Sequence, residues 1–269
     1  MGILNVTPDS FADAEHLDAG RAIDAALAMQ AAGADVLDIG GESTRPGAVP
    51  VSADEELRRV LPVLRGLAGR LAIPVSIDTY KASVAEAAVG EGATIVNDIS
   101  GLLYDPLMAA TVARCGAGLV LMHTRGRSAQ MYALAEYTDP VTEVGAELQA
   151  GIETAVAAGI AHDRLIVDPG IGFAKRPAHS YGVLASLPEL AVRLGRPVLA
   201  GPSRKSFMRE ALDNRPPLER DWGTAAAVTA AVLGGAHIVR VHAVAEMVQV
   251  VRVAEDIRRH GRIADGPTT

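Results

Sequence analysis

Short apolar runs alternate along the chain with longer segments whose apolar residues recur at helical spacing. The runs span a few residues each and are rich in Val and Ile, and the longer segments follow the period of amphipathic helices. This alternation is typical of successive βα units and predicts eight of them around a parallel sheet. The expected strands are 2–6, 35–39, 74–78, 94–98, 119–123, 165–168, 197–201 and 237–242, and the expected helices are 19–32, 52–71, 81–91, 106–114, 140–158, 179–194, 224–233 and 244–260.

Two architectures fit eight such units. Units of ~34 residues suit a closed (β/α)8 barrel, which takes about 250 residues in total. The alternative, an open doubly wound sheet, normally carries a G-x-G-x-x-G phosphate loop directly after its first strand. Here the first expected strand runs into NVTPD at 5–9 instead. We therefore predict an α/β fold, a single-domain TIM barrel over residues 1–269.

Composition excludes several classes of protein. With 25 Lys and Arg against 32 Asp and Glu, the formal charge of -7 provides no general field for a nucleic-acid backbone. The single cysteine, Cys115, cannot form an internal disulfide, and the first residues do not resemble a secretion signal. No apolar run reaches the ~18 residues of a membrane span. These features predict a cytoplasmic protein.

The expected helix 224–233 is small and apolar on nearly every face. Such a helix needs a second covering surface besides the sheet, which a homodimer would supply. The alternative explanation is that alanine simply has a high helix propensity.

Acidic and amide residues end several of the expected strands. Asp78, Asn97 and Asp168 end strands three, four and six, and strand ends of this kind meet at one mouth of a barrel. Buried carboxylates need donors, so these residues suit a heterocycle with a guanidine-like edge of ring N–H and amine groups. The alternative is structural: Asp78 would cap the helix that begins near Lys81, and Asn97 and Asp168 would brace loops.

Cationic groups follow other strands and predict an anion site. Arg45 follows strand two and Lys205 follows strand seven, where residues 203–206 could also begin a short helix with free N–H groups. Phosphate is the natural ligand, because barrels often bind it near strands seven and eight. The alternative for Arg204 and Lys205 is a solvated basic pair.

Arg240 and His242 share one face of the eighth expected strand, which otherwise reads as apolar. Alternate residues of a strand point to the same side, so at least one of the two should point into the barrel.

The sequence shows neither a metal cage nor a nucleophile. The seven histidines form no H-x-x-x-H pair and join no cysteine cluster, which argues against structural zinc. Asn5 could supply one oxygen to Mg²⁺ carried by a phosphate, since Mg²⁺ usually keeps several waters. Cys115 lies at an expected helix end, and no serine has an obvious His and carboxylate partner.

Eight strings in chain order resemble those of dihydropteroate synthase, and together they span the whole chain. One string alone would be weak evidence, but each of the eight lies at an expected strand end. They are MGILNVTPDSF at 1–11, DIGGESTRPG at 38–47, SIDT at 76–79, VNDI at 96–99, LMH at 121–123, DPGIGF at 168–173, SRKS at 203–206 and VRVH at 239–242.

The resemblance implies a folate-pathway transferase that joins the pterin of a dihydropterin pyrophosphate to the amine of para-aminobenzoate and is a sulfonamide target. It implies a dissociative mechanism, in which a neutral amine attacks a pterin cation, so that no protein nucleophile is needed. It also implies Mg²⁺ as cofactor.

The resemblance assigns residues to each part of this reaction. The pterin pocket would comprise Asp78, Asn97, Ile99, Met122, Asp168, Phe173, Gly201 and Lys205. Pyrophosphate would be held by Asn5 (through the metal), Arg45, Arg240 and His242, and aminobenzoate by Phe11, Thr44, Arg45, Pro46, Phe173, Lys205 and Ser206. The catalytic set would be Asp13, Arg45, Lys205, Arg240 and His242.

Two rival functions remain open on the sequence. A pterin-binding methyltransferase barrel has a similar deep pocket but acts on a methyl-folate with a corrinoid partner, and would not need the STRP and SRKS strings. A non-catalytic paralogue that binds a pterin or a partner protein is the other rival. Its support is local divergence from the family pattern, in ADAEHL at 12–17 and at Ala243, where the family usually has Asp.

Overall fold

The structure is a computed structural model of the chain. It describes residues 1–7, 12–13, 16–43, 48–127 and 131–261, and for residues 12–13 and 16–17 it describes the backbone alone.

Parallel strands form a closed ring at the centre of the molecule. Six of them hydrogen-bond in the order β1 (Gly2–Asn5), β4 (Leu37–Gly40), β5 (Val75–Asp78), β6 (Ile95–Asp98), β7 (Gly118–Met122) and β8 (Leu165–Asp168). A separate parallel pair consists of β9 (Leu199–Ala200) and β10 (Ile238–Val239).

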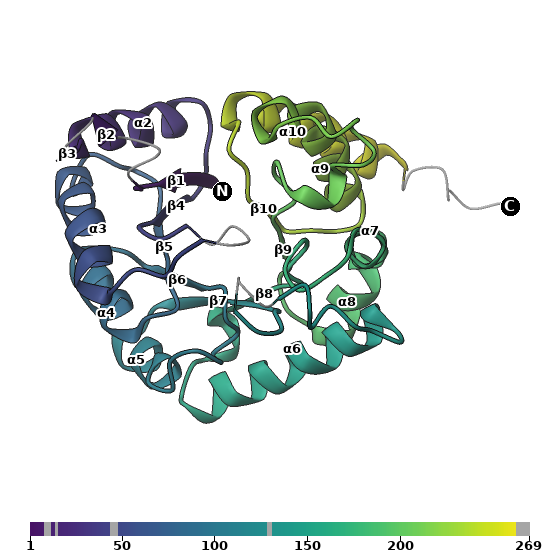
Figure 1. Cartoon of the computed structure of the whole chain (residues 1–269), viewed down its shortest axis with the longest axis horizontal. Helices are drawn as coiled ribbons and strands as arrows, with labels where there is room; N and C mark the ends of the chain where they lie inside the picture. The colour runs from purple at the N-terminus through teal and green to yellow at the C-terminus, as the bar shows by residue number, and fades with distance from the viewer. Residues whose placement is uncertain (8–11, 14–15, 44–47, 128–130, 262–269) are drawn as a thin grey trace, which may run out of the picture.

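Single bridges join this pair to both edges of the six-stranded sheet. Val167 pairs with Val198 at one edge, and Gly2 pairs with Val241 at the other. Figure 1 shows the helices arranged around the outside of these strands. The predicted (β/α)8 barrel is confirmed, and the open doubly wound sheet is wrong.

Helices follow the strands at nearly all the expected places. Their bounds are α2 (Ala19–Ala31), α3 (Ala53–Leu67), α4 (Ala82–Gly90), α5 (Met108–Cys115), α6 (Pro140–Ala157), α7 (Pro177–Ala185), α8 (Leu187–Leu194), α9 (Asp221–Leu233) and α10 (Val244–Gly261). Short 3₁₀ turns occur at η1 (His162–Arg164), η2 (Ser206–Met208) and η3 (Pro217–Glu219). None of the helices in the described parts of the chain combines the length and the apolar character needed to cross a membrane.

The secondary structure differs from the expectations in several places. The expected strands 197–201 and 237–242 are reduced to the two-residue strands β9 and β10. The expected helix 179–194 is divided into α7 and α8 at Ser186, and Pro188, which lacks a backbone N–H, lies in the first turn of α8, where that N–H has no partner within the helix. The loop after β1 holds an unexpected antiparallel pair, β2 (Ala12–Asp13) and β3 (His16–Leu17). Strands of two residues are too short to leave a period in the sequence.

The interior of the barrel has an apolar floor. Met1, Val120 and Leu199 come from different strands or strand ends and form one buried cluster. Neighbours packed against it include Val36, Ile95, Ile166 and Ile238. The strands are covered on both faces, by this cluster inside and by helices outside, which explains why they read as continuous apolar runs.

Helix α9 is partly covered within the chain itself. It contacts α10 and α7 as well as β10. Thr224, Ala227 and Val228 are buried on it, whereas Trp222 near its start is 88% exposed. The neighbouring helices therefore supply much of the second covering surface that its apolar sequence requires.

Candidate active site

The polar site lies one alternate position above the apolar floor. Because residues i and i+2 of a strand face the same side, the side chains two residues beyond the floor also point into the barrel. Counting two residues onward from the floor residues Val36, Ile95, Ile166 and Ile238 gives Asp38, Asn97, Asp168 and Arg240, respectively. The register thus brings these four polar side chains to the mouth formed by the carboxyl ends of the strands.

Arg240 joins two carboxylates across this mouth. Its Nε donates to Asp38 Oδ2 and its Nη2 donates to Asp78 Oδ2, each at 2.6 Å. Asn97 Nδ2 also donates to Asp38 Oδ2, at 3.1 Å. The prediction that Arg240 or His242 points into the barrel is therefore confirmed for Arg240.

Asp78 does not cap the following helix. The backbone N–H of Ala82, the first residue of α4, donates instead to Asp105 Oδ2 at 2.8 Å. The carboxylate of Asp78 is directed to Arg240, so the structural alternative for Asp78 is wrong.

Burial controls the charges of this cluster. It raises the pKa of Asp78 to about 7, although Arg240 opposes the shift. Burial alone would lower the pKa of Arg240, but Asp38 and Asp78 raise it, so the guanidinium stays charged. Asp38 Oδ1 and Asp78 Oδ1 are buried without a hydrogen-bond partner among the described residues. Each is an acceptor that a ligand N–H group can satisfy.

Asp168 and Lys205 form the other side of the site. Asp168 is 4% exposed, and its Oδ1 accepts the N–H of Gly170 at 2.7 Å. Burial raises the pKa of Asp168. The expected loop-bracing role of Asp168 is thus present in part, but it occupies only one of two oxygens. The other carboxylate oxygen, Oδ2, can therefore accept a hydrogen bond from a ligand.

Lys205 is held against the loop that follows β8. Its Nζ donates to the carbonyl of Ile171 at 2.6 Å and lies 4.5 Å from the centre of the Phe173 ring. A Cβ on Gly201 would lie 3.7 Å from both Lys205 Nζ and Arg240 Cβ. Gly201 therefore lies beside both residues, and a small side chain there would make ordinary van der Waals contacts with them.

His242 and Arg204 have different partners from those expected of a simple anion site. His242 Nδ1 lies 2.9 Å from Ser203 Oγ. Arg204 pairs with Asp221, both contacts being 2.7 Å. The solvated basic pair is thus wrong for Arg204, and Lys205 is buried in the site. The helix expected from 203–206 is only the single turn η2, which begins at Ser206 and is too short for an anion site.

The remaining predicted residues divide into two groups. Ile99 and Met122 are buried at strand ends, Asn5 ends β1 half-buried, and Ser206 Oγ lies 3.0 Å from the hydroxyl of Tyr132. Phe11, Thr44, Arg45 and Pro46 lie outside the described residues, and Asp13 is described by its backbone in β2 alone.

Sequence reasoning missed Asp38 and Lys175. Asp38 was quoted within a motif but given no role, because its partner Arg240 is 202 residues away. Lys175 had a usable signal: the chain has only three lysines, at 81, 175 and 205, among 25 basic residues. All three are buried or nearly so.

The titration of these lysines provides a test. Burial lowers the pKa of Lys175 to about 7 and that of Lys205 to about 8, whereas Glu42 and Glu56 hold the pKa of Lys81 above its ordinary value. We expect ¹³Cε-lysine NMR to show three resonances, two of which titrate below pH 9; Lys→Arg variants assign them. The unfolded chain keeps both protons up to about pH 10, so these lysines make stability rise with pH from about 7 to 10. Three titrations near pH 10.4 would contradict the described burial.

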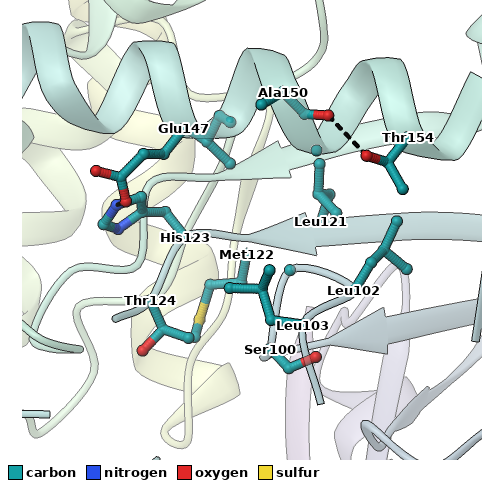
Figure 2. Close-up of a pocket in the computed structure, with 13 residues that line it drawn as sticks. Ser100, Leu102, Leu103, Leu121, Met122, His123, Thr124, Glu147, Ala150 and Thr154 are labelled. Atoms are coloured by element: carbon teal, nitrogen blue, oxygen red, sulfur yellow. Dashed lines mark hydrogen bonds and ion pairs between the residues drawn. The ribbon is translucent and has the colours of Figure 1, made fainter. Parts of the chain in front are cut away.

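A cavity of ≈ 290 Å³ lies beside the polar site. Its walls come from the loop after β6 (Ser100–Leu103), the end of β7 (Leu121–Thr124) and α6. In Figure 2, Glu147 reaches from α6 onto the ring of His123 at one end of this cavity. The residues that line it include Met122 but none of Asp78, Asp168 or Arg240, so it is separate from the polar cluster.

No three His, Cys, Asp or Glu side chains are grouped to hold a metal in the parts of the chain that the structure describes. The predicted metal ligand, Asn5, is an amide at the mouth and pairs in register with Gly40. An amide oxygen is compatible with Mg²⁺ as one ligand among substrate and water oxygens.

Comparison with known proteins matches this geometry to a family. The model of the pterin-binding enzymes matches residues 1–242. The chain is 46% identical to the dihydropteroate synthase of Synechocystis, with 96% of this chain and 90% of the relative covered, and 47% identical to that of Mycobacterium leprae, with 94% and 91% covered.

Solved structures give the same result. A dihydropteroate synthase from Clostridium difficile, crystallised in the presence of pteroic acid, superposes with a TM-score of 0.90 at 42% identity and covers 96% of this chain and 95% of its own. That of Xanthomonas albilineans with 4-aminobenzoic acid has a TM-score of 0.88 at 42% identity, with 99% and 93% covered. Sequence strings, barrel and strand-end chemistry therefore agree, and the chain belongs to the dihydropteroate synthases of the pterin-binding enzyme family.

Proposed function

We propose that this chain condenses 6-hydroxymethyl-7,8-dihydropterin pyrophosphate with para-aminobenzoate to give 7,8-dihydropteroate and pyrophosphate. The observation that carries the proposal is the mouth itself, where buried carboxylates with unused oxygens lie beside partly buried cations. This combination suits a flat heterocycle rich in N–H donors that carries an anionic leaving group. The ligands named for the related structures are a pteroic acid and a 4-aminobenzoic acid, which fit such a mouth.

The pterin would occupy the deeper part of the mouth. Asp168 would accept from the ring N–H and exocyclic amine of the pterin, and Asn97 would serve mixed donor and acceptor positions on the same edge. Asp78 would accept at the other ring, and Lys205 would donate to the ring carbonyl. Ile99, Met122, Phe173 and Gly201 would form the walls.

Arg240 would stabilise the charge that develops on the departing pyrophosphate. Its contacts with Asp38 and Asp78 use two of its five N–H groups and fix the orientation of the guanidinium. A donor held in place before the reaction lowers the barrier more than one that must reorganise. His242 and Arg45 would add further donors, and Asn5 would hold Mg²⁺, which neutralises the leaving group when bound.

The aminobenzoate would bind nearer the solvent, between Phe173, Lys205 and Ser206 and the loop residues Phe11, Thr44, Arg45 and Pro46. In this proposal the reaction is dissociative. C–O cleavage gives a pterin cation near Asp13, the neutral amine attacks it, and the amine then loses a proton. Closure of the loops would keep water, the competing nucleophile, away from the cation.

One assay distinguishes this function from its rivals. Purified protein is incubated with the dihydropterin pyrophosphate and para-aminobenzoate, with Mg²⁺ or with EDTA, and dihydropteroate and pyrophosphate are measured. Both products should form in equal amounts with Mg²⁺ and disappear with EDTA. Pterin binding without product would support the non-catalytic paralogue, whereas methyl transfer from a methyl-folate to a corrinoid protein would support the methyltransferase.

Assembly and location are further parts of the proposal. A homodimer is supported by the exposed apolar side chains of Trp222, Leu218 and Leu233 at and near α9. Sedimentation velocity should then give twice the 27.9 kDa chain mass, and a monomer at micromolar concentration would exclude it. The cytoplasmic location expected from the single cysteine stays a prediction.

A further inference from the structure

Lys175 is a buried cation without a role in the proposed reaction. It lies just before α7 and is 1% exposed. Its Nζ lies 2.8 Å from His123 Nδ1 and donates to the carbonyls of Gly170 and Phe173 at 3.1 and 3.2 Å. Below its pKa of about 7 the side chain is an ammonium with three N–H donors, and these three contacts satisfy it completely.

His123 is oriented to accept from Lys175. Its Nε2 lies 3.0 Å from Glu147 Oε2, and a carboxylate can only accept, so Nε2 carries the proton and Nδ1 is the bare acceptor. Burial and the neighbouring Lys175 lower the pKa of His123 to about 4, which keeps the ring neutral. Arg125 in turn pairs with Glu147. Glu147 on α6 therefore contacts His123, as Figure 2 shows, and His123 in turn contacts the ammonium of Lys175.

The turn at residues 170–173, which Lys175 contacts, also contacts Asp168 and Lys205, the two charged residues proposed to bind the pterin. Gly170 donates its N–H to Asp168, and Ile171 offers its carbonyl to Lys205. Phe173 presents its ring to the same ammonium. Gly170 has a φ of 66°, in the left-handed region that favours glycine. A Cβ on Gly170 would lie 1.9 Å from the carbonyl oxygen of His123, so only glycine fits at this turn.

We propose that Lys175, held by His123 and Glu147, is a positioning residue that ties the 170–173 turn to the end of β7 and thereby fixes Asp168 and Lys205 for pterin binding. The inference rests on the proposed function for the identity of the ligand, whereas the effect of Lys175 on the turn is a property of the unliganded protein. Removing the ammonium leaves the Gly170 and Phe173 carbonyls without a donor. The turn can then move away from β7 and shift the partners of Asp168 and Lys205.

The first test uses the unliganded protein. Lys205 lies over the Phe173 ring, so its ε protons should be shifted upfield by the ring current, and the small number of lysines makes the signal easy to assign. In Lys175→Met, these protons should move toward the value of free lysine. Arg114→Met, which removes an exposed cation paired with Glu86, is the matched control and should leave them unchanged.

The second test measures binding and turnover. For Lys175→Met we expect the Kd for the dihydropterin pyrophosphate, measured without aminobenzoate, to rise about 10- to 100-fold, as when one or two hydrogen bonds are lost. KM for para-aminobenzoate should rise as well, because Phe173 and Lys205 also line the proposed aminobenzoate site. A folded variant with unchanged Lys205 signals and unchanged pterin Kd would overturn the proposal.

A second pair of variants covers the case in which Lys175→Met does not fold. His123→Asn keeps an acceptor near the Nδ1 position and should behave like the parent protein, whereas His123→Leu removes the acceptor and should shift the Lys205 signals and weaken pterin binding. Equal behaviour of the two variants would also overturn the proposal. If the parent protein forms no dihydropteroate, the proposed function fails, and the Lys205 signals still decide the role of Lys175.

Discussion

Asp168→Asn is expected to weaken binding of the dihydropterin pyrophosphate by about 100-fold or more. The asparagine keeps one acceptor oxygen, which the Gly170 N–H already occupies at 2.7 Å, and turns a donor toward the ring N–H of the pterin. Hydrogen bonds to a charged partner contribute roughly 1.5–3 kcal/mol each, and two such bonds correspond to at least a hundredfold in Kd. Isothermal titration calorimetry with the pterin substrate, without aminobenzoate, measures this directly.

A matched control for Asp168→Asn lies in the turn that precedes β8. Asp163 is exposed in η1, directly before β8 and at the opposite end from the mouth. Asp163→Asn should therefore leave pterin affinity unchanged. Thermal unfolding should show both variants folded, because the contact to Gly170 survives in the first and the second is at the surface. Equal pterin affinity in Asp168→Asn and the parent would remove Asp168 from the site.

Arg240→Ala is expected to reduce kcat by about 100- to 1,000-fold, the usual effect of losing a preorganised donor to developing charge. The structure adds a second consequence. Asp38 and Asp78 lose their shared cation, and breaking a buried ion pair costs about 3–5 kcal/mol of stability. Stopped-flow single-turnover rates and urea unfolding separate the two effects. Arg65→Ala, which removes an exposed partner of Glu91, is the control for both.

The pH dependence of the Arg240→Ala stability has a defined sign. Asp78 already titrates at about 7 because of burial, and loss of the opposing cation raises its pKa further. The folded variant then binds more protons than the folded parent near pH 7 to 8, so its stability relative to the parent, which shares the opposing contribution of Lys175 and Lys205, falls as pH rises from 6 to 8. A stability difference between variant and parent that is the same at pH 6 and pH 8, with unchanged kcat, would show that Arg240 has neither role.

Much of the fold was predictable because its information is local. Strands buried on both faces leave short apolar runs, and helices leave a period of three to four residues. Errors arose where the signal was too short or depended on one residue. Pro188 divides an otherwise continuous helical pattern, and the two-residue strands β2 and β3 carry no period.

The candidate site was predictable only in part. Asp78, Asn97 and Asp168 were found because each is the last or next-to-last residue of a strand, and the parallel topology brings strand ends together. Asp38 and Lys175 were not found, since their significance lies in distant partners. Ser76, whose hydroxyl is buried without a partner among the described residues, lies two residues before Asp78 and pairs in register with Asp38.

By itself the sequence determined the number of βα units, the end of the barrel that carries the chemistry, and the residue types gathered there. Spacing along a strand is enough for this, because side-chain direction repeats every two residues. Only the tertiary structure decided which side chains contact one another. Arg240 donates to both Asp38 and Asp78, and Lys175 contacts His123. These contacts depend on closure of the ring and on the register between strands, which bring Arg240 and Asp38 together across 202 positions and which no local pattern encodes.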